Sequence, residues 1–326
     1  MKLIIQIPCY NEAETLAITL AALPRQVVGF DTVEWLIIDD GSSDDTVGVA
    51  LKNGVEHIVR HTTNQGLAKA FISGLDACLR LGADVIVNTD ADNQYYADDI
   101  PLLTEPIIDK RADIVVGARP IAAIEHFSPV KKILQKLGSW VVRITSQTNI
   151  PDAPSGFRAI SRSAAQQLMV FNTYTYTLET IIQAGQKNMA ITSVPIRVNE
   201  ELRPSRLMRS IPSYIRRGTV TIIRIFIIYR PFRFFGLIGL LLLAVGLLIS
   251  LRFLWFYING DGDGHIQSLI FSAAFLGMGF QTCLVAFVAD LQAANRKLLE
   301  DIRYRILAGK ELEILSRSNN NKREQM

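Results

Sequence analysis

The chain has 326 residues, of which 49% are hydrophobic and 20% are charged, and its formal net charge is +3. A charge this small gives no reason to expect nucleic acid as a partner. The cysteines at 9, 78 and 283 are too scattered for a disulfide framework or a thiolate metal site, which fits a reducing compartment. The apolar run at the N-terminus is too short for a signal peptide, so we expect the N-terminal half to be cytosolic.

Within the first 200 residues, short apolar segments alternate with segments of helical periodicity. Strands are predicted at 3–8, 35–39, 57–61, 84–90 and 113–119, and helices at 12–22, 45–53, 66–81 and 98–110. This alternation predicts an α/β fold, with a mostly parallel, Rossmann-like sheet covered by helices on both faces. Ligands of such open sheets bind at the carboxyl ends of the strands.

Polar clusters follow three of the predicted strands: PCYNE after the first, DDGSSDD after the second and TDADNQ after the fourth. In an extended chain, Asp90 and Asp92 point the same way, so their carboxylates would repel each other without a cation. Mg²⁺ favours one or two carboxylates together with phosphate oxygens and water. The pair therefore predicts a divalent metal that carries phosphates.

The other clusters are compatible with a nucleotide, although each has a structural alternative. Glu12 could accept hydrogen bonds from a ligand or cap its own helix. Asp39 and Asp40 could bind a nucleobase or ribose, or form a turn with the glycine that follows. Gly66 and Lys69 lie at a predicted helix start, which is a natural phosphate site.

Two long apolar segments follow, at 234–258 and 266–290. At about 1.5 Å per residue, each is long enough to cross a hydrocarbon core of about 30 Å. The short loop between them contains no Lys or Arg, whereas basic residues such as Arg233 and Arg296 lie on the outer sides of the pair. The positive-inside rule therefore places both termini in the cytoplasm.

Two further segments flank the spans. Residues 211–233 mix Ile, Phe and Tyr with arginines, which predicts an amphipathic helix at the membrane surface. Residues 291–326 are predicted to be a cytoplasmic C-terminal helix and tail. The helical spacing of Leu298, Ile302 and Ile306 could mediate assembly into a homo-oligomer, or could pack on the N-terminal domain.

Taken in order, the motifs of residues 1–210 resemble the inverting family 2 glycosyltransferases, which have a GT-A fold. The matching segments are PCYNE (8–12), DDGS (39–42), NQG (64–66), DADNQ (90–94), GAR (117–119), PSGFRAISR (154–162), TLETI (177–181) and VPIRV (194–198). Each motif alone is weak, but the ordered set is highly specific. With its two spans, the chain looks most like the polyisoprenyl-phosphate glycosyltransferases, which include dolichol-phosphate mannose synthases and bacterial enzymes that make undecaprenyl-phosphate glucose.

The resemblance implies a nucleotide-sugar donor and a divalent metal, Mg²⁺ or Mn²⁺, on its diphosphate. The expected metal ligands are Asp90, Asp92 and Gln94. Together with the clusters above, the expected donor-binding residues are Pro8, Tyr10, Glu12, Asp39, Asp40, Gly66, Lys69, Asp90, Ala91, Asp92 and Arg119.

The expected acceptor is a lipid phosphate, which is already anionic and needs no strong base. Arginines can clamp such a phosphate, although for each basic residue a solvated side chain is the alternative. The candidates for the acceptor phosphate are Lys131, Lys132, Ser155, Arg158, Arg203, Ser205 and Arg206. Here the chain departs from many relatives, because Arg206 stands where they have a Lys. Asp92, Arg158 and Arg206 are predicted to be the catalytic residues.

The predicted reaction is inverting transfer of one sugar to undecaprenyl phosphate at the cytoplasmic face of the membrane, with release of a nucleoside diphosphate. UDP-glucose is the first choice of donor, because the layout resembles the undecaprenyl-phosphate glucose enzymes. GDP-mannose and UDP-linked amino sugars remain open. A processive polysaccharide synthase would carry a Gln-x-x-Arg-Trp motif, which this sequence lacks, and a non-catalytic nucleotide-sugar-binding protein would be expected to lose a metal carboxylate.

Overall fold

A computed structural model describes residues 1–120, 139–140, 142–143, 146, 148–170, 176–200, 202, 220, 223–224, 227–260 and 263–324. The chain divides into two compact units, which are treated separately. One unit comprises Met1–Gly218 with Tyr304–Met326, and the other comprises Thr219–Arg303.

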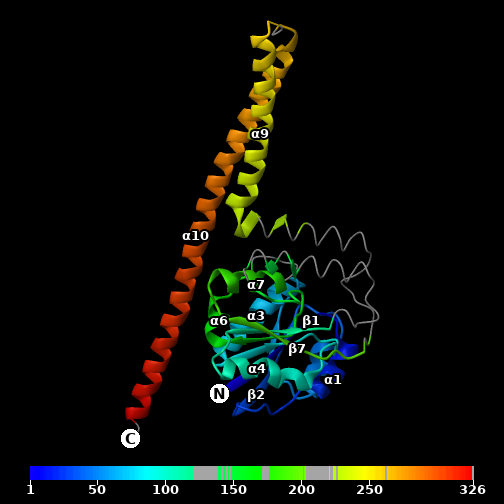
Figure 1. The fold of residues 1–326 in the computed structure, drawn as a ribbon. Helices are drawn as coiled ribbons and strands as arrows, with labels where there is room; N and C mark the ends of the chain where they lie inside the picture. Colours follow the sequence, from blue (N-terminus) through cyan, green and yellow to red (C-terminus); the bar gives the residue numbers. More distant parts are fainter. Residues whose placement is uncertain are drawn as a thin grey trace. The chain divides into compact units, whose positions relative to one another are not determined.

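Among the described residues, the first unit contains one seven-stranded sheet with the order β3-β2-β1-β4-β6-β5-β7 (Figure 1). The strands are β1 (Lys2–Cys9), β2 (Thr32–Asp39), β3 (His57–Arg60), β4 (Val85–Asn88), β5 (Ile114–Ala118), β6 (Arg158–Ser161) and β7 (Ile191–Pro195). Strand β6 is antiparallel to β4 and β5, and the other pairs are parallel. The expected mostly parallel sheet is confirmed, whereas β6 and β7 were not predicted.

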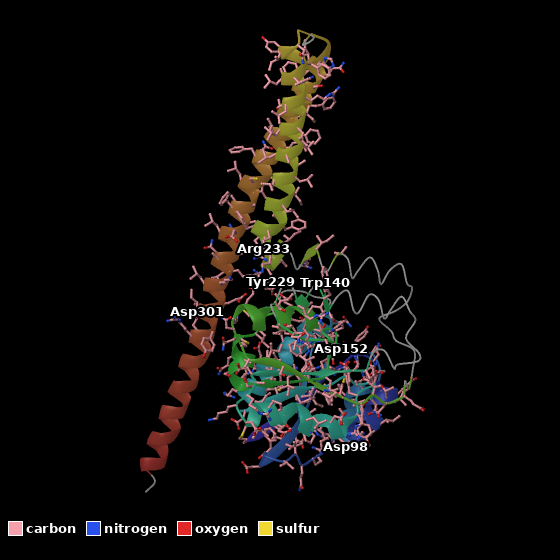
Figure 2. The ribbon with its side chains drawn as sticks, in the orientation of Figure 1. Asp98, Trp140, Asp152, Tyr229, Arg233 and Asp301 are labelled. Atoms are coloured by element: carbon pink, nitrogen blue, oxygen red, sulfur yellow. The ribbon has the colours of Figure 1, made fainter. Side chains whose placement is uncertain are left out.

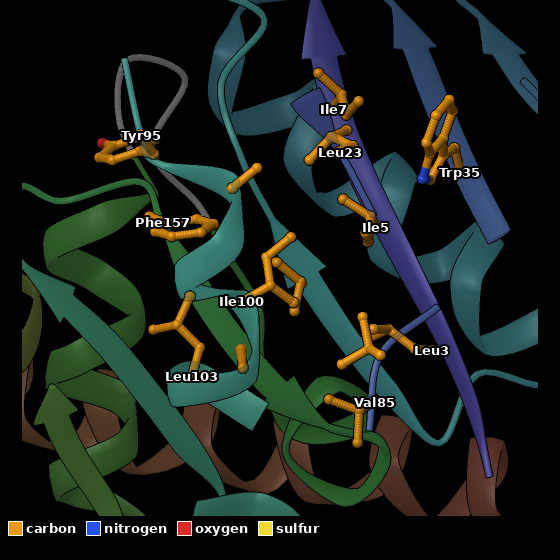
Figure 3. Packing of buried hydrophobic residues seen from close by; sticks show 14 of the residues in the cluster. Leu3, Ile5, Ile7, Leu23, Trp35, Val85, Tyr95, Ile100, Leu103 and Phe157 are labelled. Atoms are coloured by element: carbon orange, nitrogen blue, oxygen red, sulfur yellow. The ribbon is translucent and has the colours of Figure 1, made fainter. Parts of the chain in front are cut away.

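Helices cover both faces of this sheet (Figure 1). They are α1 (Ala13–Ala22), α2 (Thr46–Lys52), α3 (Leu67–Arg80), α4 (Ile100–Ile108), α6 (Arg162–Gln167) and α7 (Thr177–Gln186), with a short 3₁₀ helix, η1 (Ala97–Asp99). Because side chains alternate along a strand, Leu3, Ile5 and Ile7 of β1 share one core with residues of α1 and α4 (Figure 3). Gln6 points to the other face, where a Cβ added at Gly74 of α3 would lie 2.5 Å from its Oε1.

A close contact joins the loops that follow β2 and β3. Gly41 has a φ of +74°, and a Cβ added there would lie 2.6–2.9 Å from backbone atoms of Thr63 and Asn64. The left-handed conformation and the lack of space both require glycine at this position. The loop after β3 therefore lies directly against the loop after β2.

The second unit contains a helical hairpin of α9 (Pro231–Ile258) and the part of α10 (Ile266–Glu324) up to Arg303, with η2 (Asp263–His265) between them. By length and composition, Pro231–Ile258 and Ile266–Ile306 can each cross a membrane, with mean hydropathies of 2.7 and 1.8. Helix α10 continues without a break beyond the predicted span 266–290, so the predicted C-terminal segment is part of the same helix. The predicted interfacial segment 211–233 lies mostly outside the described residues.

Small residues bring α9 and α10 together. A Cβ added at Gly239 would lie 3.1 Å from the backbone nitrogen of Cys283, and one added at Gly246 would lie 2.9 Å from that of Leu276. The hydroxyl of Ser272 donates to the carbonyl of Gly246 at 3.0 Å. Close backbone approach through small residues is the usual way in which apolar helices associate in lipid.

An arginine fixes the chain just before α9. Arg296 of α10 donates from Nη1 to the carbonyl of Ile228 at 3.1 Å, and its guanidinium lies 4.4 Å from the ring centre of Tyr229 (labelled in Figure 2). Glu300 lies 3.5 Å from Nε of Arg296. These contacts hold the entry to the first predicted span against the second.

Candidate active site

The loops after β1 and β2 are joined by hydrogen bonds between backbone and side chains. The amide of Asn11 donates to Ser42 Oγ at 2.9 Å, and the amide of Ser43 donates to Asn11 Oδ1 at 2.8 Å. The amide of Glu12 donates to Thr46 Oγ1 at 2.9 Å. The two motifs that the sequence separates by about 30 residues therefore form one surface at the carboxyl edge of the sheet.

On this surface the predicted donor-binding residues have different environments. Pro8 lies within β1, in register with Ile38, whereas the Tyr10 side chain just beyond the strand is 44% exposed. Glu12 is the N-cap residue of α1, but its side chain makes no capping hydrogen bond to the helix backbone. Its Oε2 instead accepts a hydrogen bond from the Thr15 hydroxyl at 3.0 Å.

Asp39 and Asp40 are buried and organise the loops around them. Asp39 Oδ1 accepts from the amide of Ser42 at 2.9 Å, which is the turn expected as the structural alternative. The carboxylate of Asp40 accepts from the amides of Gln65 and Gly66 at 2.9 and 2.8 Å.

His61 completes this arrangement, and the sequence did not single it out. Its Nδ1 lies 2.7 Å from Asp40 Oδ1, and its Nε2 lies 3.0 Å from Ser73 Oγ. The carboxylate of Asp40 therefore binds the loop that leads into α3. At the start of that helix, Gly66 has a φ of +94° and Lys69 is exposed.

Asp90 and Asp92 follow β4, and the negative charge of Asp92 acts on the Asp90 carboxylate. Asp90 is half-buried, and its burial together with the charge of Asp92 raises the pKa of Asp90 to about 7. The positive charge of Arg119 and a hydrogen bond from Tyr95 act in the opposite direction. Helix α1 fixes the loop that carries Asp90 and Asp92, because the hydroxyl of Thr19 in α1 donates to the carbonyl of Ala91 at 2.8 Å.

The carboxylates of Asp90 and Asp92 suit a divalent cation that also has phosphate oxygens as ligands. Among the described residues, no group of three or more His, Cys, Asp or Glu side chains could hold a metal ion by itself. A carboxylate whose charged form is disfavoured by burial and by a neighbouring carboxylate suits Mg²⁺ or Mn²⁺, whose remaining ligands would be phosphate oxygens and water. The amide of Gln94, which lies half-buried in the same loop, could supply a further oxygen ligand.

The segment after β7 supports the Asp90–Asp92 loop, and its role was not predicted. Tyr95 forms an antiparallel bridge with Val198. The amide of Asn199 donates to the carbonyl of Gln94 at 2.9 Å, and its side chain donates to the carbonyl of Asn93 at 2.8 Å. The VPIRV motif could have indicated this segment, because it ends at Val198, directly before Asn199.

Arg119 is held by a buried partner that the sequence analysis missed. Its Nε and Nη2 donate to the two oxygens of Asp152 (labelled in Figure 2) at 2.7 and 3.0 Å, and the two side chains are 7% and 1% exposed. Burial lowers the pKa of the Arg119 side chain. The effects of Tyr95, Asp152 and Asp90 raise this pKa by more, so Arg119 stays charged. A fixed positive charge therefore lies beside Asp90. The only signal for Asp152 was its place two residues before the PSGFR motif.

Arg158 does not have the environment that was predicted for it. The residue is fully buried, and it donates to the carbonyls of Ser155 and Ala153 at 2.8 and 2.7 Å and to Thr180 Oγ1 at 2.5 Å. In this structure the guanidinium holds the 153–155 loop, and the contact of Arg158 with an acceptor phosphate stays a prediction. Ser155 is also fully buried, and its hydroxyl has no hydrogen-bond partner among the described residues.

The other predicted acceptor residues lie outside the described part of the chain. They are Lys131, Lys132, Arg203, Ser205 and Arg206. The site that the structure describes thus consists of the joined loops after β1 and β2, the Asp90–Asp92 loop, and the Arg119–Asp152 ion pair.

Comparisons with known proteins agree with this geometry. A family model described as "Glycosyl transferase family 2" matches residues 4–169. The chain is 30% identical over 218 residues to an undecaprenyl-phosphate mannosyltransferase of Micrococcus luteus, covering 64% of this chain and 88% of that protein. It is 26% identical over 277 residues to a dolichol-phosphate mannosyltransferase of Pyrococcus furiosus, covering 79% of this chain and 73% of that protein.

Two further similarities concern the donor sugar and the fold. A UDP-N-acetylglucosamine–dolichyl-phosphate N-acetylglucosaminyltransferase of Methanococcus voltae is 30% identical over 213 residues, covering 59% of this chain and 83% of that protein. Glucosyl-3-phosphoglycerate synthase from Mycobacterium tuberculosis, solved with Mn²⁺, UDP and glucosyl-3-phosphoglycerate, gives a TM-score of 0.53 at 18% identity, covering 69% of this chain and 78% of that chain. The GT-A fold predicted from the motifs is confirmed.

We predict that Arg158→Met destabilises the protein, because it leaves two loop carbonyls without their buried charged donor. The expected loss is about 3 kcal/mol in the free energy of unfolding. Denaturation of the purified full chain in detergent measures it. Arg111, whose side chain is 61% exposed, is the control, and Arg111→Met should cost no more than about 1 kcal/mol. An Arg158→Met variant as stable as this control but inactive would favour a direct role in ligand binding.

Proposed function

The chain belongs to glycosyl transferase family 2, and from this premise we propose that it transfers one sugar from a nucleotide sugar to a polyprenyl phosphate. The observation that carries the proposal is the Asp90–Asp92 pair beside the fixed charge of Arg119. This arrangement suits a reaction in which two phosphate-bearing substrates must approach each other. The relatives named above, which are undecaprenyl-phosphate and dolichyl-phosphate sugar transferases, support the same class of acceptor.

The proposed reaction is an in-line displacement at the anomeric carbon. A phosphate oxygen of the acceptor forms a new bond to this carbon as the bond to the donor diphosphate breaks, so the configuration inverts. The acceptor oxygen is already anionic, and no proton has to be removed from it. A bound Mg²⁺ or Mn²⁺ would neutralise the departing diphosphate. Its proposed ligands are Asp90, Asp92 and Gln94.

Arg119 is proposed to offset the negative charge that accumulates when both substrates are bound. Its bidentate ion pair with Asp152 fixes the plane of the guanidinium, and two of its N–H groups are used in that pair. A guanidinium has five N–H donors, so others can face a phosphate. Asp152 thereby acts as a positioning residue for Arg119.

The two candidate spans are proposed to keep the catalytic domain at the cytoplasmic face of the membrane. An acceptor phosphate at that surface could enter the site while its isoprenoid tail stays in lipid. The tail then never has to be transferred into water, which would cost about 0.8 kcal/mol per CH₂ group.

For the donor we propose UDP-glucose, because the chain with its two spans resembles the undecaprenyl-phosphate glucose enzymes. The relatives named for mannose and N-acetylglucosamine transfer make GDP-mannose and UDP-N-acetylglucosamine the two competing donors. We also propose undecaprenyl phosphate as the acceptor.

The released nucleotide tests the reaction class. Purified full-length protein, undecaprenyl phosphate and Mn²⁺ are incubated in separate reactions with UDP-glucose, GDP-mannose and UDP-N-acetylglucosamine. Chromatography of the UDP-glucose reaction should show UDP and a lipid monophosphate sugar in equal amounts. UMP with a lipid diphosphate sugar would indicate phosphosugar transfer and refute the proposed reaction. If the protein turned over only GDP-mannose or only UDP-N-acetylglucosamine, the proposed donor would be wrong, but the proposed reaction class would stand.

The membrane orientation is tested by cysteine labelling in intact cells. In a variant without the three native cysteines, Gly262→Cys should react with an impermeant thiol reagent, because it lies in the loop between the spans. Ser318→Cys should react only after the cells are opened. The reverse pattern would show that the positive-inside rule gives the wrong orientation for this chain.

A further inference from the structure

One residue after β7 holds the loop after β4 at three successive carbonyls. Asn199 donates from its side-chain nitrogen to the carbonyl of Asn93 at 2.8 Å and to that of Tyr95 at 3.2 Å. Its backbone amide donates to the carbonyl of Gln94 at 2.9 Å. The bridge between Tyr95 and Val198 fixes the backbone on either side of these contacts. The conformation of this loop therefore depends directly on Asn199.

One peptide unit of the loop connects Asn199 with Asp92. Its carbonyl is that of Asn93 and accepts the hydrogen bond from the Asn199 side chain. Its N–H is that of Gln94 and donates to Asp92 Oδ1 at 3.2 Å. The carbonyl and the N–H of a trans peptide point in opposite directions. A donor that fixes the carbonyl on one side therefore aims the N–H at the carboxylate on the other side.

The backbone of Asn93 makes this support necessary. Asn93 has a φ of +54°, in the left-handed region that residues other than glycine adopt uncommonly, although asparagine is among the more tolerant. Such a conformation persists where the surrounding structure holds it. Without the Asn199 side chain, the peptide unit after Asn93 is free to turn, and its N–H then leaves Asp92.

We propose that Asn199 is a positioning residue, which holds this peptide unit so that the Asp92 carboxylate keeps the orientation that receives the divalent cation. This inference rests on the proposed function, because it takes Asp92 to be a cation ligand. A carboxylate that is already oriented loses less rotational freedom when the cation binds, so the cation binds more tightly. Asn199 thus acts through Asp92, as hydrogen-bonded partners of metal ligands commonly do.

The test uses Mn²⁺ alone and the full chain in detergent. Asn199→Ala removes the side-chain donor but keeps the backbone amide that binds the carbonyl of Gln94. We expect the dissociation constant for Mn²⁺, measured by electron paramagnetic resonance, to rise about tenfold. In turnover assays the Mn²⁺ concentration for half-maximal activity should rise by a similar factor, while kcat at saturating Mn²⁺ stays close to that of the wild type. An unchanged dissociation constant in the folded variant would overturn the inference.

Arg197→Met is the matched control, because it loosens the same segment without removing a donor to the peptide unit. The exposed side chain of Arg197 donates from Nε to Asp99 Oδ1 at 2.9 Å. Its replacement should leave the Mn²⁺ dissociation constant within about threefold of the wild type. Loss of a positive charge by itself favours a bound cation. Weakening equal to that of Asn199→Ala would therefore come from a looser segment, and it would refute the specific role of Asn199.

Asn199→Leu is a second approach, should Asn199→Ala fold poorly. Leucine has a branched side chain of similar shape to that of asparagine, but it donates no hydrogen bond. Mn²⁺ should again bind about tenfold more weakly. Wild-type affinity in this variant would show that the loop needs only the bulk of the side chain, which contradicts the proposal.

Asp92→Asn separates this inference from the proposed function. If Asp92→Asn binds Mn²⁺ as well as the wild type, or if the wild type binds none, the metal assignment itself is wrong. If Asp92→Asn loses Mn²⁺ binding and Asn199→Ala keeps it, only the role of Asn199 is refuted.

Discussion

Two carboxylates held close together at the end of a buried strand are the constraint on which this site depends. Burial and the charge of Asp92 both disfavour the charged form of Asp90. The fold supplies what keeps them in place: the Thr19 hydroxyl on the carbonyl of Ala91, and the Asn199 side chain on the carbonyl of Asn93. A loop that is fixed in this way retains a need for positive charge, which a cation carrying phosphates would satisfy.

A buried polar chain extends this support into the sheet. Gln6 of β1 donates to Asn88 of β4 at 2.9 Å, and Asn88 donates to the carbonyl of Gly156 at 2.9 Å. Gly156 in turn lies against Asp90. Buried polar groups with all partners in place fix one arrangement of their neighbours, so the interior of the sheet determines the position of the loop that borders the site.

Sequence patterns predicted the parts of the fold that repeat regularly. Alternating apolar segments located β1 to β5, and the Asp-x-Asp spacing drew attention to the loop after β4. The four-residue strand β6 was missed because it begins with a charged residue, Arg158, and has no apolar run. The burial of Arg158 was missed for the same reason, since composition cannot reveal that loop carbonyls bind a buried guanidinium. Asp152 and Tyr95 became recognisable only when folding brought distant loops together.

The helical hairpin and the GT-A domain have separate physical requirements. The hairpin of α9 and α10 depends on small residues such as Gly239 and Gly246, whereas the GT-A domain depends on a charged site at its strand ends. The position of Mn²⁺ in crystals of the full chain, located by its anomalous scattering, tests the central claim most directly. We expect one peak within coordination distance of both Asp90 and Asp92. A peak elsewhere, with this pair of carboxylates unoccupied, would contradict the assignment.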